Sequence, residues 1–265
     1  MHAEDPGMLL LLTACAATPA AESLRLGAPS WSAASADITA SVVPWSRDGE
    51  AGRLVLARIS PRAAVSVLTT NTPTPLQELL PEGDMVSING GFYDGAGAAM
   101  GLSISRGRLR TPLRSSGGSG VLLIRAGDSR IVHRDDVGDL DGVTGAVQSI
   151  DRLASGGQSL VSGQASLARD ARSGVAVTAD GGLLFAALFA EEAVARETDA
   201  DIYLDADSTS SGASLGEWAA LMVGLGGGSV LNLDGGFSTA IHVSLGGERL
   251  DVHPHGATIN AVIAR

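Results

Sequence analysis

The chain has 265 residues, of which 45% are hydrophobic, so it is long enough to bury a sizeable core as one large domain or two small ones. Its formal net charge of -11 at pH 7, with no run of Lys and Arg to offset it, excludes nucleic acid as a partner. Beyond the N-terminal segment, no apolar stretch approaches the roughly 20 residues that span a bilayer. Only 3% of the residues are aromatic and 35 are Gly, which favours tight turns and a β-rich, aliphatic core.

The first 35 residues differ from the rest of the chain. A short apolar run ends in Leu12, Thr13, Ala14 and Cys15, which resemble the signal box of a bacterial lipoprotein, where the Cys is lipidated. Residues 1–35 are therefore predicted to be a signal-like segment and linker. The protein is then exported, and it is either anchored to the bacterial cell envelope through Cys15 or secreted, with no other membrane contact. The start, MHAEDPG, lacks Lys and Arg, which leaves open a truncated or misassigned start, or a disordered terminus whose Cys is incidental.

The following segments predict strands that arrive in pairs. Alternating apolar residues over 38–67 indicate two or three half-buried strands, and MVSIN at 85–89 indicates another. Three hairpins follow, within residues 101–110, 120–133 and 173–189, the first of them turning at Arg106 and Gly107. SVLNL at 229–233 predicts a further strand, and the apolar run 257–265 predicts a last strand in the middle of a sheet.

One helix is strongly indicated near residue 215. Ser214 and Glu217 form a capping box, and apolar residues recur at helical spacing until Gly226. No Pro-rich linker divides the chain after residue 35. The predicted fold class is therefore α+β: a mixed, largely antiparallel β-sheet built from hairpins, with a few packed helices, in a single domain covering residues 36–265.

Two strands run into the same short motif. VSINGGFYD at 86–94 and VLNLDGGFST at 230–239 each place Asn or Asp before a pair of glycines and a Phe. Paired glycines permit a sharp turn and leave backbone amides uncovered, so an anion or a sugar oxygen can approach them. The predicted donors are the amides of Gly90, Gly91, Gly235 and Gly236, and each Phe is expected to return to the core and hold its turn rigid. Two ordinary tight turns are the alternative interpretation.

The polar side chains around these motifs are the candidate site. Asp234 is the first catalytic candidate, with Ser238 and Thr239 behind it, and Asp94 is the second. Arg172 precedes a strand and is placed to clamp a phosphate with its guanidinium. A surface loop Asp and a solvated strand-end Arg are the alternatives. No residue pattern requires a cofactor or defines a metal site, and a divalent cation is left open.

An ordered set of motifs from residue 84 to the C-terminus resembles the phosphodiester glycosidases, a family that includes enzymes releasing N-acetylglucosamine from a phosphodiester. The set comprises INGGFYD, GLSISRGRL, AVQS, LVSG, ARSGVAVTADGGLLF, SLGEWAALMVGLG, VLNLDGGFSTAI and INAVIA. The chain departs from the family at Gly236, Phe237, Ser238 and Thr239, where a third glycine and a serine pair are usual. It also departs at Ile150 and Asp151, where Gly-Pro is usual.

The resemblance implies a hydrolase that cleaves the bond between the anomeric carbon of a sugar and a phosphodiester oxygen, in a sugar phosphate or an envelope or extracellular glycan. Asp234 and Asp94 would then stabilise the developing cation or activate water, and Arg172 with the glycine amides would hold the phosphate. The hydroxyl groups of the sugar would be bound by Asn89, Gln148, Ser238 and Thr239.

Two other functions stay open at this stage. A lipoprotein that binds an envelope polysaccharide without cutting it would use the same pocket. A metal-dependent phosphodiesterase would break the P–O bond in place of the C–O bond.

Overall fold

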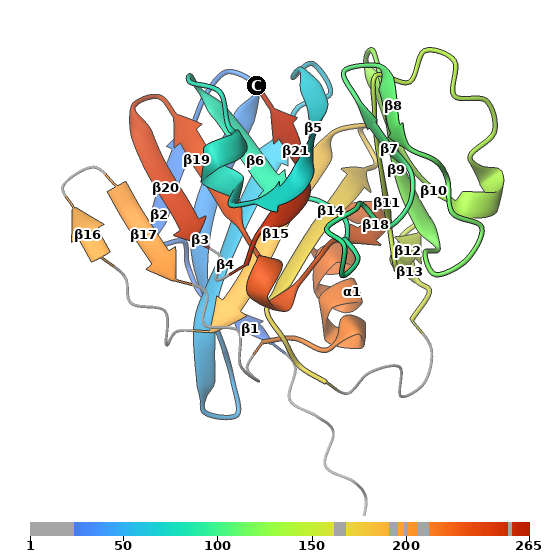
Figure 1. Ribbon diagram of the computed structural model, residues 1–265. Helices are drawn as coiled ribbons and strands as arrows, with labels where there is room; N and C mark the ends of the chain where they lie inside the picture. Colours follow the sequence, from blue (N-terminus) through green and yellow to red (C-terminus); the bar gives the residue numbers. More distant parts are fainter. Residues whose placement is uncertain (1–23, 162–167, 191–195, 199–200, 206–211, 254–255) are drawn as a thin grey trace, which may run out of the picture.

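The computed structural model describes residues 24–161, 168–190, 196–198, 201–205, 212–253 and 256–265 (Figure 1). Strands make up 53% of the described residues and helices 9%, and the strands form three sheets. The fold is therefore mostly β, and the predicted α+β class with a few packed helices is wrong. In the described part of the chain there is one α-helix, because the other apolar runs are short or have the two-residue period of strands.

The first sheet has nine strands in the order β1-β3-β4-β15-β14-β18-β12-β13, with β2 also paired to β3. Its strands are β1 (Arg25–Leu26), β2 (Trp31–Ala34), β3 (Ile38–Arg47), β4 (Glu50–Ile59), β12 (Arg152–Ser155), β13 (Gln158–Ser159), β14 (Arg172–Thr178), β15 (Leu183–Ala190) and β18 (Gly227–Asn232). β14 and β15 form the hairpin predicted over residues 173–189, which is confirmed.

The second sheet has seven strands in the order β16-β17-β20-β19-β6-β21-β5. They are β5 (Val65–Thr74), β6 (Met85–Asn89), β16 (Arg196–Thr198), β17 (Asp201–Asp205), β19 (Ile241–Leu245), β20 (Glu248–His253) and β21 (Thr258–Ala264). β17 pairs with β20 in parallel, and the other pairs are antiparallel. β21 lies between β6 and β5, which confirms the central last strand.

The third sheet has five strands in the order β10-β9-β11-β7-β8. They are β7 (Ser103–Ser105), β8 (Arg108–Thr111), β9 (Gly120–Arg125), β10 (Asp128–His133) and β11 (Gly145–Ser149). β7 with β8 and β9 with β10 are the other two predicted hairpins, and both are confirmed. Short 3-10 helices lie at η1 (Leu76–Leu79), η2 (Arg134–Asp136) and η3 (Gly236–Ser238).

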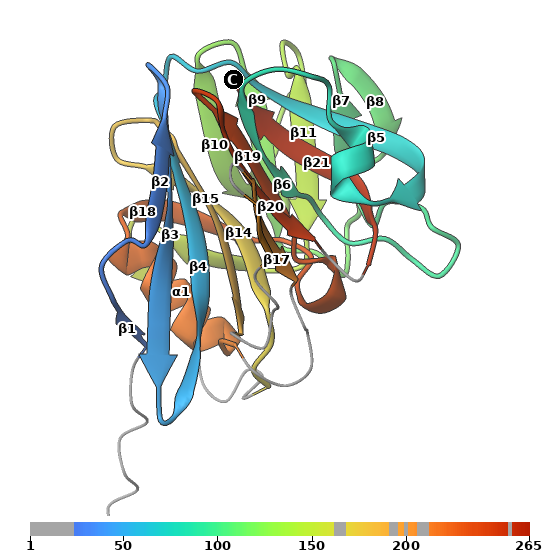
Figure 2. The ribbon, with the colours of Figure 1, turned by 90° about the vertical axis from the view of Figure 1, so that its left-hand side faces the viewer.

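β15 shows how the nine-stranded sheet is buried on both faces. Its odd-numbered residues, such as Phe185 and Phe189, belong to a core shared with strands of the seven-stranded sheet, whereas Leu184 and Leu188 pack in a second core with Trp218 of the helix. Successive side chains of a strand point to opposite faces, so one strand supplies both cores. The helix, the nine-stranded sheet and the seven-stranded sheet therefore form successive layers (Figure 2).

The helix is α1 (Leu215–Gly224), and its start is the predicted capping box. The Ser214 hydroxyl accepts a hydrogen bond from the Glu217 amide, and the Glu217 carboxylate accepts one from the Ser214 amide at 2.8 Å. No helix in the described ranges is both long and apolar enough to cross a membrane. Cys15 and the rest of the predicted signal-like segment up to residue 23 lie outside the described residues.

Candidate active site

The two glycine motifs come together where the nine-stranded and seven-stranded sheets meet at their strand ends. Asn89, the last residue of β6, donates from its amide nitrogen to the Asp234 carbonyl at 2.7 Å. Its amide oxygen accepts from the Ser173 hydroxyl at 2.7 Å and from the Ala240 amide at 3.0 Å. The Asp234 amide in turn donates to the Gly90 carbonyl at 2.9 Å. Asn89 is fully buried and is used by the protein itself, so it fixes the position of Asp234.

Asp234 has the environment of a functional carboxylate. It follows β18, and burial raises its pKa from an ordinary value of 3.8 to about 6. A hydrogen bond with Ser238 lowers this pKa, and the negative charge of Asp170 raises it further. A carboxyl group that titrates near 6 can be ionised at neutral pH and still accept a proton readily, which suits acid–base chemistry.

Two further carboxylates and Arg172 share this site. Burial raises the pKa of Asp170 and that of Asp151, and the charge of Arg172 lowers both pKa values. The Arg172 guanidinium donates from Nε to the Ala213 carbonyl at 2.7 Å and from Nη2 to the Ala168 carbonyl at 3.0 Å. Within the described residues its other N–H groups have no partner. One partly buried cation, with donors left for a ligand, therefore lies near Asp170 and Asp151, and Asp170 in turn lies near Asp234.

Asp151 and Asp170 were not among the residues predicted from the sequence. Asp170 lies two residues before Arg172 and forms an isolated β-bridge with Ala213, and a Cβ atom added to Gly236 would lie 3.0 Å from Asp170 Oδ2. The Asp151 carbonyl accepts a hydrogen bond from the Asn232 amide at 2.9 Å, which holds its segment against the end of β18. The available signal for Asp170 was its position in ARDARSG beside Arg172.

Three of the four predicted glycine amides are engaged by the protein. Gly90 donates to the Asn260 carbonyl at 2.7 Å, Gly91 to the Asn260 side chain at 2.9 Å, and Gly236 to the Ala171 carbonyl at 2.9 Å. The amide of Gly235 has no hydrogen-bond partner in the described part of the chain, so it is the one of the four left for a ligand. The glycines at 90 and 91 serve close packing, because an added Cβ atom would lie 1.8 Å from Asn260 Oδ1 and 2.5 Å from the Gln148 carbonyl, respectively.

Of the other predicted hydroxyl-binding residues, the side chains of Gln148 and Ser238 form hydrogen bonds within the described part of the protein, whereas that of Thr239 does not. Gln148 is buried, and its amide makes four hydrogen bonds, to the Leu102 and Arg114 amides and to the Arg114 and Gly118 carbonyls. It therefore fastens the loop after β8 to β11. Ser238 is buried, and its one hydroxyl proton can be donated either to the Asp234 carboxylate or to the Ala257 carbonyl, which lies 3.3 Å from its oxygen. The Thr239 hydroxyl is fully buried without a partner in the described residues.

Asp94 and Phe237 are exposed. The Asp94 carboxylate accepts hydrogen bonds from the Ala96 and Ala98 amides at 2.9 and 3.0 Å, which closes its own loop. Among the described residues, no hydrogen bond or ion pair joins it to Asp234. Phe237 is 58% exposed, so the expectation that its ring returns to the core is wrong. Its place in η3, between buried Gly236 and Ser238, turns the ring outward.

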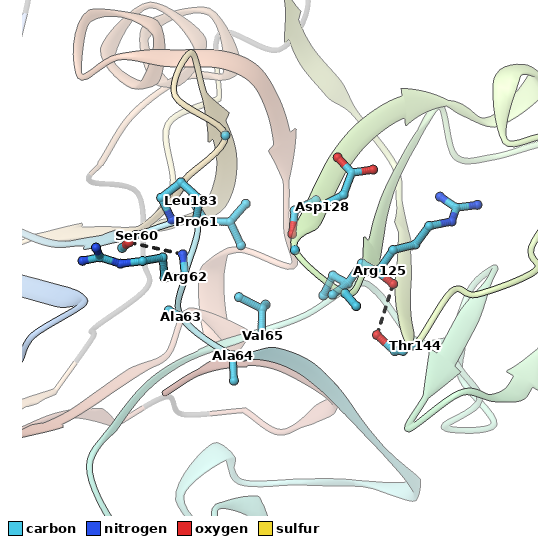
Figure 3. Close-up of a pocket in the computed structure, with 15 residues that line it drawn as sticks. Ser60, Pro61, Arg62, Ala63, Ala64, Val65, Arg125, Asp128, Thr144 and Leu183 are labelled. Atoms are coloured by element: carbon cyan, nitrogen blue, oxygen red, sulfur yellow. Dashed lines mark hydrogen bonds between the residues drawn. The ribbon is translucent and has the colours of Figure 1, made fainter.

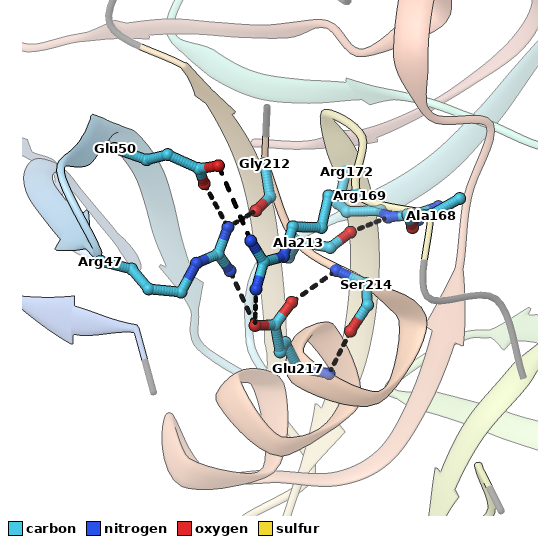
Figure 4. Close-up of polar contacts among 9 residues, drawn as sticks. All are labelled: Arg47, Glu50, Ala168, Arg169, Arg172, Gly212, Ala213, Ser214 and Glu217. Carbon is cyan, nitrogen blue, oxygen red and sulfur yellow. Dashed lines mark hydrogen bonds and ion pairs between the residues drawn. The ribbon is translucent and has the colours of Figure 1, made fainter. Parts of the chain in front are cut away.

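A network of two arginines and two glutamates supports the site from the side of α1 (Figure 4). Arg47 is buried and bonds to Glu50, to Glu217 at 2.7 Å and to the Gly212 carbonyl at 2.8 Å, and Arg169 lies near both glutamates. Burial raises the pKa of Glu217, but hydrogen bonds with Ser214 and the charges of Arg47 and Arg169 outweigh it and hold the pKa below its ordinary value. The network fixes residues 212–214, whose Ala213 carbonyl positions Arg172.

Two cavities lie near the strand ends of the five-stranded sheet. One of about 350 Å³ opens beside Asp151 and is also lined by Ser119 and His133. A larger one of about 540 Å³ is lined by Arg62, Arg125 and Thr144 (Figure 3), at the opposite end of β9 from Gly120, which pairs with Ser149. That cavity is remote from the carboxylates. Within the described residues there is no group of three or more His, Cys, Asp or Glu placed to hold a metal ion.

Comparison with known proteins places the chain in a family. The sequence profile of the phosphodiester glycosidases matches residues 82–263, which include β6, β14, β18, Asp151, Asp170 and Asp234. The chain belongs to the phosphodiester glycosidase family. No match was found among curated protein sequences.

Three solved structures share the fold of this phosphodiester glycosidase. The catalytic domain of zebrafish N-acetylglucosamine-1-phosphodiester alpha-N-acetylglucosaminidase, auto-inhibited by its pro-peptide, aligns with a TM-score of 0.64 and 18% identity over 91% of this chain and 87% of that one. A hypothetical protein from Synechocystis aligns with a TM-score of 0.55 and 17% identity, over 86% and 62% of the two chains. A putative exported protein from Burkholderia pseudomallei K96243 aligns with a TM-score of 0.51 and 14% identity, over 81% and 74%.

Proposed function

We propose that this glycosidase hydrolyses a sugar-1-phosphodiester by breaking the bond between the anomeric carbon and the phosphate oxygen. The observation that supports this most strongly is the charged cluster in which Arg172 lies near Asp170 and Asp151, and Asp170 in turn lies near Asp234. Cleavage of a glycosidic bond develops positive charge on the sugar and negative charge on the leaving group. The carboxylates can stabilise the positive charge on the sugar, and the guanidinium can stabilise the negative charge on the leaving group.

The proposed reaction needs little help from a general acid. The water oxygen bonds to the anomeric carbon, and the bond from that carbon to the phosphate oxygen breaks. The electron pair of that bond leaves with a phosphate monoester, which is stable as an anion. Asp234 in its ionised form accepts the proton of the attacking water, and its pKa of about 6 makes it a competent base at neutral pH.

Arg172 and the free Gly235 amide are the proposed phosphate contacts. The unpartnered N–H groups of Arg172 can bind two phosphate oxygens, and this guanidinium is held rigid by its bonds to the Ala213 and Ala168 carbonyls. Burial lowers the pKa of Arg172, and the neighbouring carboxylates Asp170, Asp151 and Glu217 act to raise it. Desolvation of this cation strengthens its attraction to a phosphate anion.

The proposed sugar is N-acetylglucosamine, because that sugar appears in the name of the zebrafish structure that shares the fold. The proposed setting is an envelope or extracellular glycan, reached by export through the predicted signal-like segment at residues 1–35 and held there by a lipid on Cys15 or secreted. We propose no cofactor requirement.

The test is release of N-acetylglucosamine from UDP-N-acetylglucosamine and from a methyl phosphodiester of that sugar, with and without EDTA. We expect turnover by the wild type in EDTA and its loss in Asp234→Asn, with Asp94→Asn as the matched control that stays within a few-fold of the wild type. Turnover lost in EDTA would favour a metal-dependent phosphodiesterase. Absent turnover with retained binding of envelope glycans would favour a binding protein.

A further inference from the structure

A second group of arginines lines a groove outside the carboxylate site. The groove has a volume of about 540 Å³ and lies between β5 and the hairpin of β7 and β8. Arg106, Arg108 and Arg110 line it, together with Thr69 and Thr70, and no Asp or Glu is part of the lining. In a chain whose formal net charge is -11, this concave surface with three cations and no anion is a local reversal of charge.

The three guanidiniums are free to bind a ligand. Within the described residues, none of them has a hydrogen bond or an ion pair. By contrast, Arg62 and Arg130, which are also exposed, are paired with Asp37 and Asp128. Clustered like charges repel one another, so three unpaired arginines in one groove are unfavourable without an anion.

The turn at Arg106 is a second, independent observation. Arg106 has a φ of 52° and Gly107 a φ of 72°, so the hairpin turns through two left-handed residues. Gly, Asn or Asp is favoured at such a position, and a long side chain there is strained. Backbone strain of this kind is concentrated at functional positions. The turn therefore keeps an arginine at the groove at the expense of local stability.

The groove reaches the same strand ends as the carboxylate site. Thr69, in the groove lining, pairs with Asn260 of β21, which accepts hydrogen bonds from Gly90 and Gly91. Gly90 in turn accepts from the Asp234 amide. Three steps between neighbouring backbones therefore separate Thr69 from Asp234, which corresponds to a distance of roughly 15 Å. Arg108 and Arg110 of β8 both line the groove although the register of the strand shifts at Arg110, so their charges lie next to each other along it.

We infer that this groove is a second anion-binding site, which holds the phosphate groups of a linear phosphodiester polymer whose scissile unit lies at Asp234. The inference rests on the proposed function, because it assigns that site a polymeric substrate. Guanidinium groups bind phosphate through paired hydrogen bonds, and a row of them matches the repeating charge of a polymer. The net charge of the whole chain is -11, so the protein as a whole repels such a polymer and favours its binding at this local cluster of cations.

The test is binding of inorganic polyphosphate, which contains no sugar and so is not a substrate of a glycosidase. We expect the wild type to bind it, and Arg108→Ser/Arg110→Ser to bind it at least about tenfold more weakly, with a smaller dependence of the dissociation constant on salt. Arg62→Ser/Arg130→Ser removes two exposed charges elsewhere and should bind like the wild type. Arg106→Gly should bind more weakly yet unfold at a higher temperature, because glycine relieves the left-handed strain.

Three outcomes would overturn the inference. The first is no binding of polyphosphate by the wild type, and the second is an equal loss in the Arg62→Ser/Arg130→Ser control. The third is binding to phosphatidylglycerol vesicles without binding to polyphosphate, which would assign the arginines to a membrane surface. Because polyphosphate binding needs no turnover, failure of this inference is distinct from failure of the proposed glycosidase activity.

Discussion

At the scale of single residues, the raised pKa of Asp234 predicts the pH dependence of the enzyme. If the ionised carboxylate accepts the proton of water, kcat/KM should fall as the pH drops through about 6, since burial holds the pKa at that value. Burial also raises the pKa of Asp170, whose charge acts on Asp234, so the measured value belongs to this pair of carboxylates. Asp234→Asn should lower kcat/KM by about 10²- to 10⁴-fold. An activity that rises below pH 6 would make Asp234 a proton donor.

The same residue should lower the stability of the fold at neutral pH. The pKa of Asp234 is about 6 in the folded protein and near 3.8 when exposed, so the folded state binds more protons between these values and its stability falls as the pH rises through them. We expect Asp234→Asn to raise the free energy of unfolding by about 1–3 kcal/mol near pH 7.5, with the difference absent near about pH 3.5. Urea unfolding at both pH values measures this. A variant that is less stable at pH 7.5 would contradict the origin of the pKa shift.

At the scale of elements, the sequence predicted the position of the glycine motif after β6 but not its structural role. Paired glycines after a buried strand indicate a sharp turn, and the structure has one. The spacing could not show that Asn260, far along the chain in β21, occupies the space beside Gly90 and takes both amides. A capping box and a helical period are local signals, so α1 was predictable, whereas contacts between distant strands leave no local pattern.

Gly90→Ala should therefore lower the stability of the fold. An added Cβ atom would lie 1.8 Å from Asn260 Oδ1 and 2.8 Å from the Asn260 carbonyl, so we expect a loss of about 2–3 kcal/mol in the free energy of unfolding. Gly95→Ala, in the next loop with open space around its Cβ position, is the matched control and should change stability by less than about 1 kcal/mol. Equal stability of the two variants would show that Asn260 can move away from the added Cβ atom without a loss of stability.

At the scale of the whole molecule, the family-matched segment depends on strands that precede it. β4 pairs with β15 over eight residues, and β5 pairs with β21 at the edge of the seven-stranded sheet. A fragment of residues 82–265 would expose the edges of both sheets and the apolar residues of β15. We expect it to lack a cooperative thermal transition, whereas residues 24–265 should unfold cooperatively by circular dichroism. A cooperative transition in the shorter fragment would contradict this dependence.

Sequence patterns captured the strands of this molecule better than their assembly. The hairpins were predictable because each pairs neighbours in sequence. The segment 134–161 carries no clear period, and it contains η2, β11, β12 and β13, which pair with strands in two different sheets. For the same reason the site was predicted in part: Asp234 and Arg172 lie in recognisable motifs, whereas Asp151 reaches the site only because its segment bonds to β18.

The position of bond cleavage tests the central proposal most directly. Hydrolysis of a methyl phosphodiester of N-acetylglucosamine in oxygen-18 water, with EDTA present, yields a methyl phosphate whose mass reports which bond has broken. Attack at the anomeric carbon predicts methyl phosphate without oxygen-18, because its bridging oxygen departs with the phosphate. Methyl phosphate that carries one oxygen-18 atom would show attack at phosphorus, and it would contradict a glycosidase built around Asp234 and Arg172.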